Sequence, residues 1–191
     1  MTQLGSFDAV VMAGGFSRRM GTDKAALPHP VSKLPLLEHQ LRLLAALYPQ
    51  RRFVSARLHQ TLPTLPADVI RINDDGEHGP LGGITATLSA SDSDHLLVIA
   101  VDLPQLTRET LEQLFKPVPL AESGSIATTI HGVEPLVAIY PRQALPAMKA
   151  ALATGSYRLK SLLSGALKPM MTTVNFSEAT PFHNWNSPSD I

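Results

Sequence analysis

Short apolar runs alternate with amphipathic segments through much of the chain, and this order restricts the possible folds more than any other feature. The clearest runs are 7–13 and 95–101, each almost free of polar residues. A run this short without a polar face is typical of a strand buried on both sides of a sheet. Further strands are expected at 53–58 and 68–72, and helices at 36–48, at 81–91 and after the capping residue Thr107. This alternation predicts an α/β, three-layer, Rossmann-like fold whose mostly parallel sheet lies between helices.

Weaker patterns give the remaining elements. Beyond residue 116 we expect a hairpin of strands 125–130 and 134–140, a helix at 144–153 and a last strand at 172–176. Pro146 is expected to break the helix at 144–153 near its start. The apolar face of the helix at 36–48 is expected to comprise Leu37, Leu41, Leu44, Ala45 and Tyr48. No linker or repeat is visible, so we expect residues 1–191 to form a single domain.

Composition excludes several classes of protein. The 191 residues include no cysteine, which excludes disulfides, thiolate metal sites and cysteine nucleophiles. The formal net charge of +0 argues against a nucleic-acid partner, because phosphate neutralisation supplies most of the affinity of such proteins. No apolar run approaches the roughly 20 residues of a membrane-spanning helix, and the first residues lack a signal-peptide pattern. We therefore expect a cytoplasmic protein with no nucleic-acid or membrane partner.

A glycine-rich, basic loop follows the first expected strand directly, between Ala13 and Lys24. Ligands of open α/β sheets bind at the carboxyl ends of the strands. Glycines let backbone amides approach an anion closely, and arginine and lysine supply positive charge for a polyphosphate. The loop matches neither the phosphate-loop pattern of nucleoside triphosphate hydrolases nor the Gly-x-Gly-x-x-Gly pattern of dinucleotide-binding proteins. The sequence therefore predicts a different kind of polyphosphate site.

This loop resembles the signature of the molybdenum cofactor guanylyltransferases. The similar residues are Met12, Ala13, Gly14, Gly15, Ser17, Arg19, Met20, Gly21, Asp23 and Lys24. The resemblance implies the nucleotide-diphospho-sugar transferase type of fold and a nucleotide site built from Met12, Ala13, Gly14 and Gly15. It also implies that Arg19 and Lys24 hold the triphosphate and act in catalysis. Related cytidylyltransferases tend to carry Ala-Gly and Asn where this chain has Gly14-Gly15 and Asp23.

Asp102 ends the second clear apolar run, where a carboxylate projects toward the ligand-binding end of a parallel sheet. Magnesium is usually held by one or two carboxylates together with phosphate oxygens and water. The physical position and the resemblance agree, since Asp102-Leu103-Pro104 is similar to the family's magnesium-binding segment. We therefore predict that Asp102 binds Mg²⁺ and the nucleotide and takes part in catalysis.

Two further segments gain a role only through the resemblance. Asp74, Gly79 and Gly82 match a family segment that lines the nucleotide pocket, although Asp75 is placed equally well as Asp74. Near the C-terminus, Asn184 and Asn186 match family asparagines, and either amide is a suitable second ligand for the metal.

The resemblance implies transfer of GMP from GTP to molybdopterin with release of pyrophosphate, and transient contact with molybdoenzymes or their chaperones. Two alternatives remain open. Another small-acceptor nucleotidyltransferase would use CTP or a sugar phosphate, and a nucleotide-binding module would keep the fold without turnover. The joint presence of Arg19, Lys24 and Asp102 argues against the second alternative.

Overall fold

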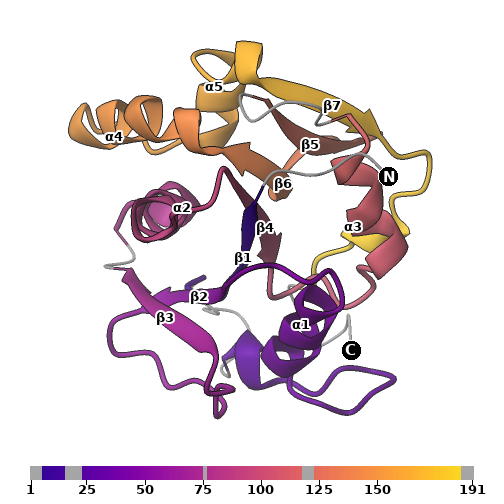
Figure 1. The fold of residues 1–191 in the computed structure, drawn as a ribbon. Helices are drawn as coiled ribbons and strands as arrows, with labels where there is room; N and C mark the ends of the chain where they lie inside the picture. The colour runs from indigo at the N-terminus through magenta and orange to yellow at the C-terminus, as the bar shows by residue number, and fades with distance from the viewer. Residues whose placement is uncertain (1–5, 16–22, 75–76, 118–122, 186–191) are drawn as a thin grey trace.

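A computed structural model describes residues 6–15, 23–74, 77–117 and 123–185 of the chain. Its centre is a seven-stranded sheet in the order β3-β2-β1-β4-β6-β5-β7, shown in Figure 1. The strands are β1 Phe7–Met12, β2 Arg52–Arg57, β3 Val69–Asp74, β4 His95–Ala100, β5 Gly124–Thr129, β6 Gly132–Pro141 and β7 Met171–Asn175. The four strands from β3 to β4 are parallel, whereas β6 runs antiparallel to both β4 and β5. The predicted α/β fold with a mostly parallel sheet is confirmed.

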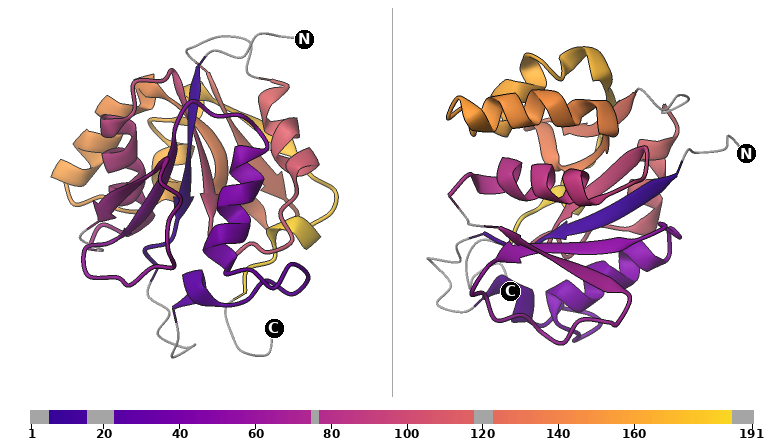
Figure 2. Two further views of the ribbon diagram at one scale, coloured as in Figure 1. Left: turned by 60° about the horizontal axis from the view of Figure 1, so that its bottom comes forward. Right: turned by 60° about the vertical axis from the view of Figure 1, so that its left-hand side comes forward.

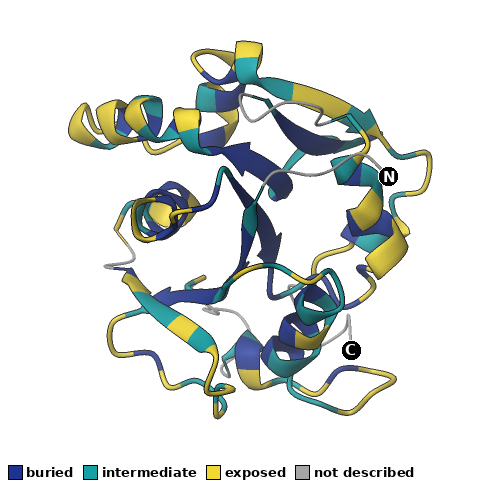
Figure 3. Ribbon diagram, viewed as in Figure 1, coloured by how far each residue is buried: buried dark blue, intermediate teal, exposed yellow. Residues whose placement is uncertain are grey.

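Helices cover both faces of the sheet, as two views in Figure 2 show. The α-helices are α1 Leu36–Ala45, α2 Gly79–Ala90, α3 Arg108–Phe115, α4 Leu145–Ala153 and α5 Leu159–Ser164. Leucines of α1 and α3 pack in one core with Val11 and Ile99. Apolar residues of α2, α4 and α5 pack in a second core with Val10 and Val98, on the opposite face. Figure 3 shows the buried sheet between these helices. No helix among the described ranges is long and apolar enough to cross a membrane.

The expected elements are present, with corrections at their ends. Helix α1 ends at Ala45, and Tyr48 has a φ of 56° and is 83% exposed, so its assignment to the apolar face was wrong. Pro146 does not break α4, because it lies in the first turn, where the missing N–H has no helical partner to lose. Helix α5 was not predicted, since its six residues are too few to show a clear helical period.

The parallel strands bring the expected site segments to one edge of the sheet. Met12, the last residue of β1, pairs with Ser55 of β2 on one side and with Ala100, the last residue of β4, on the other. The glycine-rich loop after β1 and the Asp102 loop after β4 therefore leave the sheet side by side. Asp74 is the last residue of β3 at the same edge.

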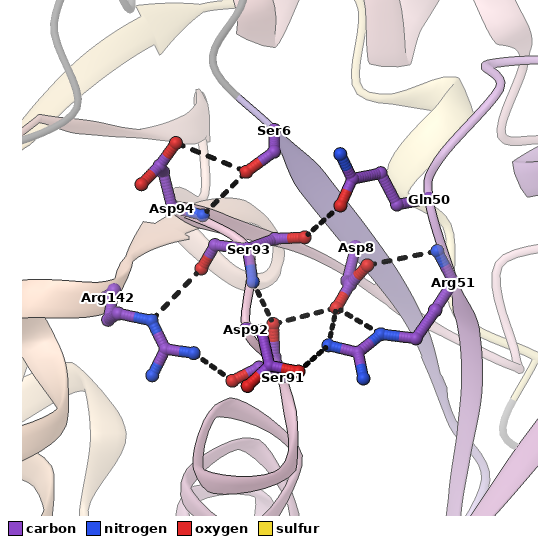
Figure 4. Close-up of polar contacts among 9 residues, drawn as sticks. All are labelled: Ser6, Asp8, Gln50, Arg51, Ser91, Asp92, Ser93, Asp94 and Arg142. Carbon is purple, nitrogen blue, oxygen red and sulfur yellow. Dashed lines mark hydrogen bonds and ion pairs between the residues drawn. The ribbon is translucent and has the colours of Figure 1, made fainter.

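A buried polar network joins the amino ends of the strands, at the opposite edge (Figure 4). The carboxylate of Asp8 is 0% exposed and accepts hydrogen bonds from the Arg51 amide at 3.0 Å and the Ser91 hydroxyl at 2.8 Å. The Arg51 guanidinium lies 3.0 Å from Asp8 and 3.2 Å from the exposed Asp92. Arg142 donates to the carbonyls of Ser91 and Ser93. The network ties β1 to the segments before β2 and β4.

We predict that Asp8→Asn lowers the free energy of unfolding by about 2 kcal/mol, because an amide cannot replace the charge-assisted bonds of a buried carboxylate. Urea denaturation at neutral pH measures this change. Asp92→Asn is the matched control, since it removes a carboxylate from the same arginine but at a position that is 92% exposed, and should shift stability by less than about 0.5 kcal/mol. Equal effects of the two changes would contradict a structural role for Asp8.

Candidate functional site

A cavity of about 320 Å³ lies at the carboxyl ends of β1 and β4. Its walls come from the glycine-rich loop, the start of α2 and the loop after β4. The lining residues are Met12, Ala13, Gly14, Gly15, Lys24, Asp74, Gly79, Pro80, Ala100, Val101, Asp102 and Leu136. Most residues predicted to bind the nucleotide are therefore gathered around one space.

Among the described residues, Gly82 and Asn184 were predicted site residues but do not line this cavity. Arg19 and Asn186 lie outside the described residues, as does Asp75. Gly82 is one turn into α2, where a β-carbon would lie 3.0 Å from the β-carbon of His78 and 3.5 Å from Asp74 Oδ1. It therefore permits close packing behind the wall. Asn184 is exposed and lines a second cavity, while the amide of the next residue, Trp185, bonds to the carbonyl of Asp102 at 2.9 Å.

A partly buried ion pair between Lys24 and Asp102 lies on the cavity wall. Lys24 Nζ lies 2.7 Å from Asp102 Oδ2, and the two side chains are 16% and 20% exposed. Lys24 begins the short 3-10 helix η1, Lys24–Ala26, which Asp23 caps by accepting the Ala25 amide at 3.0 Å. Because water is largely excluded, this pair interacts more strongly than an exposed one. The two residues singled out from separate motifs are in direct contact.

The loop that carries Asp102 is held by hydrogen bonds to three of its consecutive carbonyl groups. The Asp102 carbonyl accepts from the Trp185 amide, and the Leu103 carbonyl accepts from the Gln40 side chain at 2.7 Å. The Pro104 carbonyl lies 2.8 Å from His29 Nε2. Gln40 is 0% exposed and His29 is 6% exposed, so these bonds are shielded from water. A loop fixed at three successive points presents its carboxylate in a defined position.

The tautomer of His29 follows from its partners. Its Nδ1 accepts the backbone amides of Val31 and Ser32 at 3.2 and 3.1 Å, so Nε2 carries the hydrogen and donates to Pro104. His29 stacks on His39 with ring centroids 3.7 Å apart. Burial and the neighbouring His29 lower the pKa of His39. The lowered pKa favours the neutral form of His39, which reduces charge repulsion within the stack.

The first residue of the glycine-rich loop, Ala13, is fixed in a similar way on the other side of the cavity. The Ala13 amide donates to the Ser55 carbonyl at 2.8 Å, and the Ala13 carbonyl accepts from the buried Gln60 side chain at 2.9 Å. A β-carbon on Gly14 would contact the backbone of Ala56 and Arg57 at 3.7–3.9 Å, which is ordinary packing. Glycine at this position is therefore not required by the fold.

The start of α2 approaches the sheet closely because of Gly83. A β-carbon there would lie 2.7 Å from Met12 Cε and closer still to Ser55 Oγ. The contact brings the first turn of α2 to the cavity, where Gly79 has a φ of 57°. Helix amino termini carry partial positive charge and unpaired amides, which favour anionic ligands. Asp74, only 8% exposed, lines the same part of the cavity.

The side chains of the cavity suit a metal ion whose remaining ligands are phosphate oxygens and water. Among the described residues, no group of three or more His, Asp or Glu side chains could hold a metal ion. Magnesium needs only one or two protein carboxylates when phosphate oxygens and water complete its shell. Asp102 is suited to supply that carboxylate, and Asp74 lines the same cavity.

Comparison with known proteins agrees with this architecture. Residues 9–170 match the family model described as the MobA-like NTP transferase domain. The chain belongs to this family. A probable molybdenum cofactor guanylyltransferase from Mycobacterium tuberculosis (strain ATCC 25618 / H37Rv) is 33% identical over 190 residues, which cover 95% of this chain and 90% of the relative. The chain is therefore a nucleotidyltransferase.

Solved structures show the same fold. Molybdopterin-guanine dinucleotide biosynthesis protein A from Archaeoglobus fulgidus superposes with a TM-score of 0.70 at 22% identity, covering 96% of this chain and 94% of that protein. The 2-C-methyl-D-erythritol 4-phosphate cytidylyltransferase from Thermus thermophilus gives a TM-score of 0.63 at 15% identity, covering 95% and 93% of the two chains. The nucleotide-diphospho-sugar transferase type of fold is thereby confirmed.

Several residues that shape the cavity were not predicted from the sequence. Pro80, Ala100, Val101 and Leu136 line it, but apolar wall residues have no distinguishing sequence pattern. The side chains of His29, Gln40 and Gln60 hold backbone carbonyls of the two site loops. In the sequence, such a residue differs from others only as a polar residue among apolar neighbours, as Gln40 does inside an amphipathic helix.

We predict that Gly83→Ala destabilises the protein by about 1–3 kcal/mol and weakens nucleotide binding, because the added carbon forces the start of α2 away from β1 and β2. Gly15→Ala is the control for stability, since a β-carbon there meets nothing within 4 Å. Thermal unfolding and nucleotide titration of both variants measure the two effects. A Gly83 variant as stable as the Gly15 variant would show that the close approach of α2 is not needed.

Proposed function

We propose that this nucleotidyltransferase moves GMP from GTP to molybdopterin, releases pyrophosphate and depends on Mg²⁺. The observation that supports it best is the Lys24–Asp102 pair, at 2.7 Å, inside the cavity of the glycine-rich loop. Such a site offers one cationic group for phosphate oxygens and one carboxylate for a metal. The relative from Mycobacterium tuberculosis, described as a probable molybdenum cofactor guanylyltransferase, supports the choice of substrates.

The chemistry asks for alignment and charge neutralisation more than for covalent catalysis. An oxygen of the acceptor phosphate attacks the α-phosphorus of GTP, the bond to the β-phosphate oxygen breaks, and pyrophosphate leaves. The acceptor phosphate is ionised near neutral pH, so the reaction needs no general base. When bound, Mg²⁺ neutralises charge on the phosphate oxygens.

The ion pair has a specific part in this scheme. Without substrate, Lys24 and Asp102 neutralise each other in a confined space. A triphosphate competes for Lys24 because it carries more negative charge than one carboxylate. Asp102 is then available to hold the metal, together with Asn184 or Asn186 as a second ligand. The loop amides of Gly14 and Gly15, with Arg19, complete the phosphate contacts.

Asp102→Asn and Lys24→Ala should each reduce turnover by roughly 10²-fold or more, because each removes several kcal/mol of stabilisation of the transition state. Pyrophosphate release from GTP, Mg²⁺ and molybdopterin measures turnover. Arg42→Ala is the control, because this exposed arginine of α1 forms an ion pair with Glu38, four residues earlier, and does not line the cavity. Near-normal activity of the Asp102 variant at limiting Mg²⁺ would contradict the metal assignment.

Arg51 and Arg52 do not serve as neutral controls for that experiment. Arg51 pairs with the buried Asp8, and Arg52 donates to the Leu41 carbonyl and pairs with Asp68. Replacing either arginine would therefore remove contacts within the fold as well as a charge.

We predict that GTP is preferred over CTP and ATP as donor. Guanine presents a ring N–H and an exocyclic amine, and the carboxylate of Asp74, which lines the cavity, is an acceptor for such donors. A pocket that pairs these groups rejects a base that lacks them. Gly14→Ala should erode the preference more than it slows the best substrate, since the fold accommodates the added carbon.

The measurement is one reaction containing GTP and CTP, with the dinucleotide products separated and quantified. A dominant cytosine product would favour the cytidylyltransferase alternative. Binding of GTP without any pyrophosphate release would favour a nucleotide-binding module.

A further inference from the structure

A second cavity, of about 610 Å³, lies where the start of β6 meets the C-terminal segment and the loop after β4. The residues that matter on its wall are Gln105, His131, Glu134, Phe182 and His183. Glu134 is the only carboxylate on this wall among the described residues. The proposed transfer reaction assigns no function to these five residues.

An irregularity in β6 places Glu134 in this cavity. Ile126 of β5 pairs with Ala138 of β6, yet the next residue, Ala127, pairs with Glu134. The three intervening residues, 135–137, therefore bulge out of the pairing with β5. Pro135 explains the break, because proline has no N–H to donate to a neighbouring strand. Such bulges redirect side chains near functional sites.

The bulge is held in one conformation. The hydroxyl of Tyr140, a residue that is 0% exposed, donates to the Pro135 carbonyl at 2.8 Å. Burial raises the pKa of Tyr140, so the hydroxyl keeps its proton and remains a donor. Within the bulge, Leu136 lines the first cavity, while Glu134, just before it, lines the second.

Three short connections along the chain link the walls of the two cavities. Gln105 of the second cavity follows Asp102 of the first by three residues, and Glu134 precedes Leu136 by two. Asn184 of the second cavity precedes Trp185, whose amide bonds to the Asp102 carbonyl at 2.9 Å. A ligand long enough to span both walls would contact the Asp102 side chain with one end and Glu134 with the other.

The chemistry of the second cavity selects the class of ligand. Within the described part of the chain, the Glu134 carboxylate accepts a hydrogen bond from the Thr129 hydroxyl at 3.2 Å, and a carboxylate has capacity for further donors. It repels a phosphate group. Phe182 contributes an aromatic side chain, and Gln105, His131 and His183 contribute polar groups able to donate or accept. These features suit a flat heterocycle with neighbouring N–H donors.

We propose that the second cavity binds the heterocyclic head of the acceptor, with Glu134 accepting the ring N–H and exocyclic amine of its 2-amino-4-oxopyrimidine ring. This assignment rests on the proposed function, in which the acceptor is a pterin that carries a phosphate. The phosphate end lies toward Asp102 and Lys24, and the pterin end lies toward Glu134. A carboxylate pairs with these two adjacent donors through both of its oxygens.

Guanine presents the same two donors, so the test must separate the acceptor site from the donor site. The probes are 6-hydroxymethylpterin, its 2-oxo analogue 6-hydroxymethyllumazine, and GTP with Mg²⁺. Binding of both heterocycles to the full chain is followed by their fluorescence, and binding of GTP by calorimetry. The variant is Glu134→Gln, which keeps an oxygen for Thr129. The control is Glu178→Gln, an exposed residue of the same C-terminal segment that does not line the cavity.

The unchanged protein and the Glu178 variant should bind the pterin about tenfold more tightly than the lumazine, because the lumazine lacks the amine. Glu134→Gln should lose this preference while its affinity for GTP stays within about twofold and its thermal unfolding is unchanged. Pterin preference without GTP binding would contradict the proposed function but leave the Glu134 assignment standing.

Three results would overturn the assignment. One is equal binding of pterin and lumazine, or of neither, by the unchanged protein. Another is a pterin preference that survives in Glu134→Gln. The third is a loss of GTP affinity in that variant as large as its loss of pterin affinity, which would place guanine in this cavity instead.

Discussion

The parallel pairing of β1 with β4 is the constraint on which the rest of the site depends. Their register sets Met12 beside Ala100, so both strands end at the same level. The glycine-rich loop and the Asp102 loop then begin side by side, although about 90 residues separate them in sequence. Lys24 and Asp102 meet at 2.7 Å only because this pairing fixes the starting point of each loop. The interior strands, buried on both faces, make any slip of the register costly.

This dependence explains which parts of the site could be predicted from the sequence. The positions of Gly14 and Asp102 follow from a local pattern, an apolar run followed by a loop, and from the rule that parallel strands end at one edge. Gln40, His29 and Gln60 could not be found in this way, because their partners are backbone carbonyls up to 75 residues distant. Every residue has a backbone carbonyl, so the sequence does not show which carbonyl accepts the hydrogen bond from a given side chain.

For a similar reason, the fold was predicted better than the ends and irregularities of its helices and strands. Buried strands and amphipathic helices have periods visible in the sequence, and the α/β fold follows from their order. Tyr48 was misplaced because a tyrosine at helical spacing looks apolar, whereas the chain turns to a φ of 56° there and exposes the ring. The bulge in β6 was likewise not expected, although Pro135 is the residue that explains it. A proline marks a break in strand pairing without stating how many residues leave the ladder.

The polar groups of the molecule divide into two kinds by position along the strands. At the amino ends, Asp8 and Arg51 have all their described partners within the protein, so their charge serves the fold. At the carboxyl ends, Lys24 and Asp102 form a pair inside a cavity that is large enough to admit a ligand.

The backbone around Asp102 is bonded at three successive carbonyls, while the carboxylate itself faces the cavity. In the proposed function, a fixed backbone beneath this ion pair would let a charged substrate replace one partner without moving the loop. The same loop runs on to Gln105, so it contributes residues to the walls of both cavities. Its rigidity would fix the separation between a nucleotide on one side and a second substrate on the other, which is the alignment that a group transfer between two bound molecules requires.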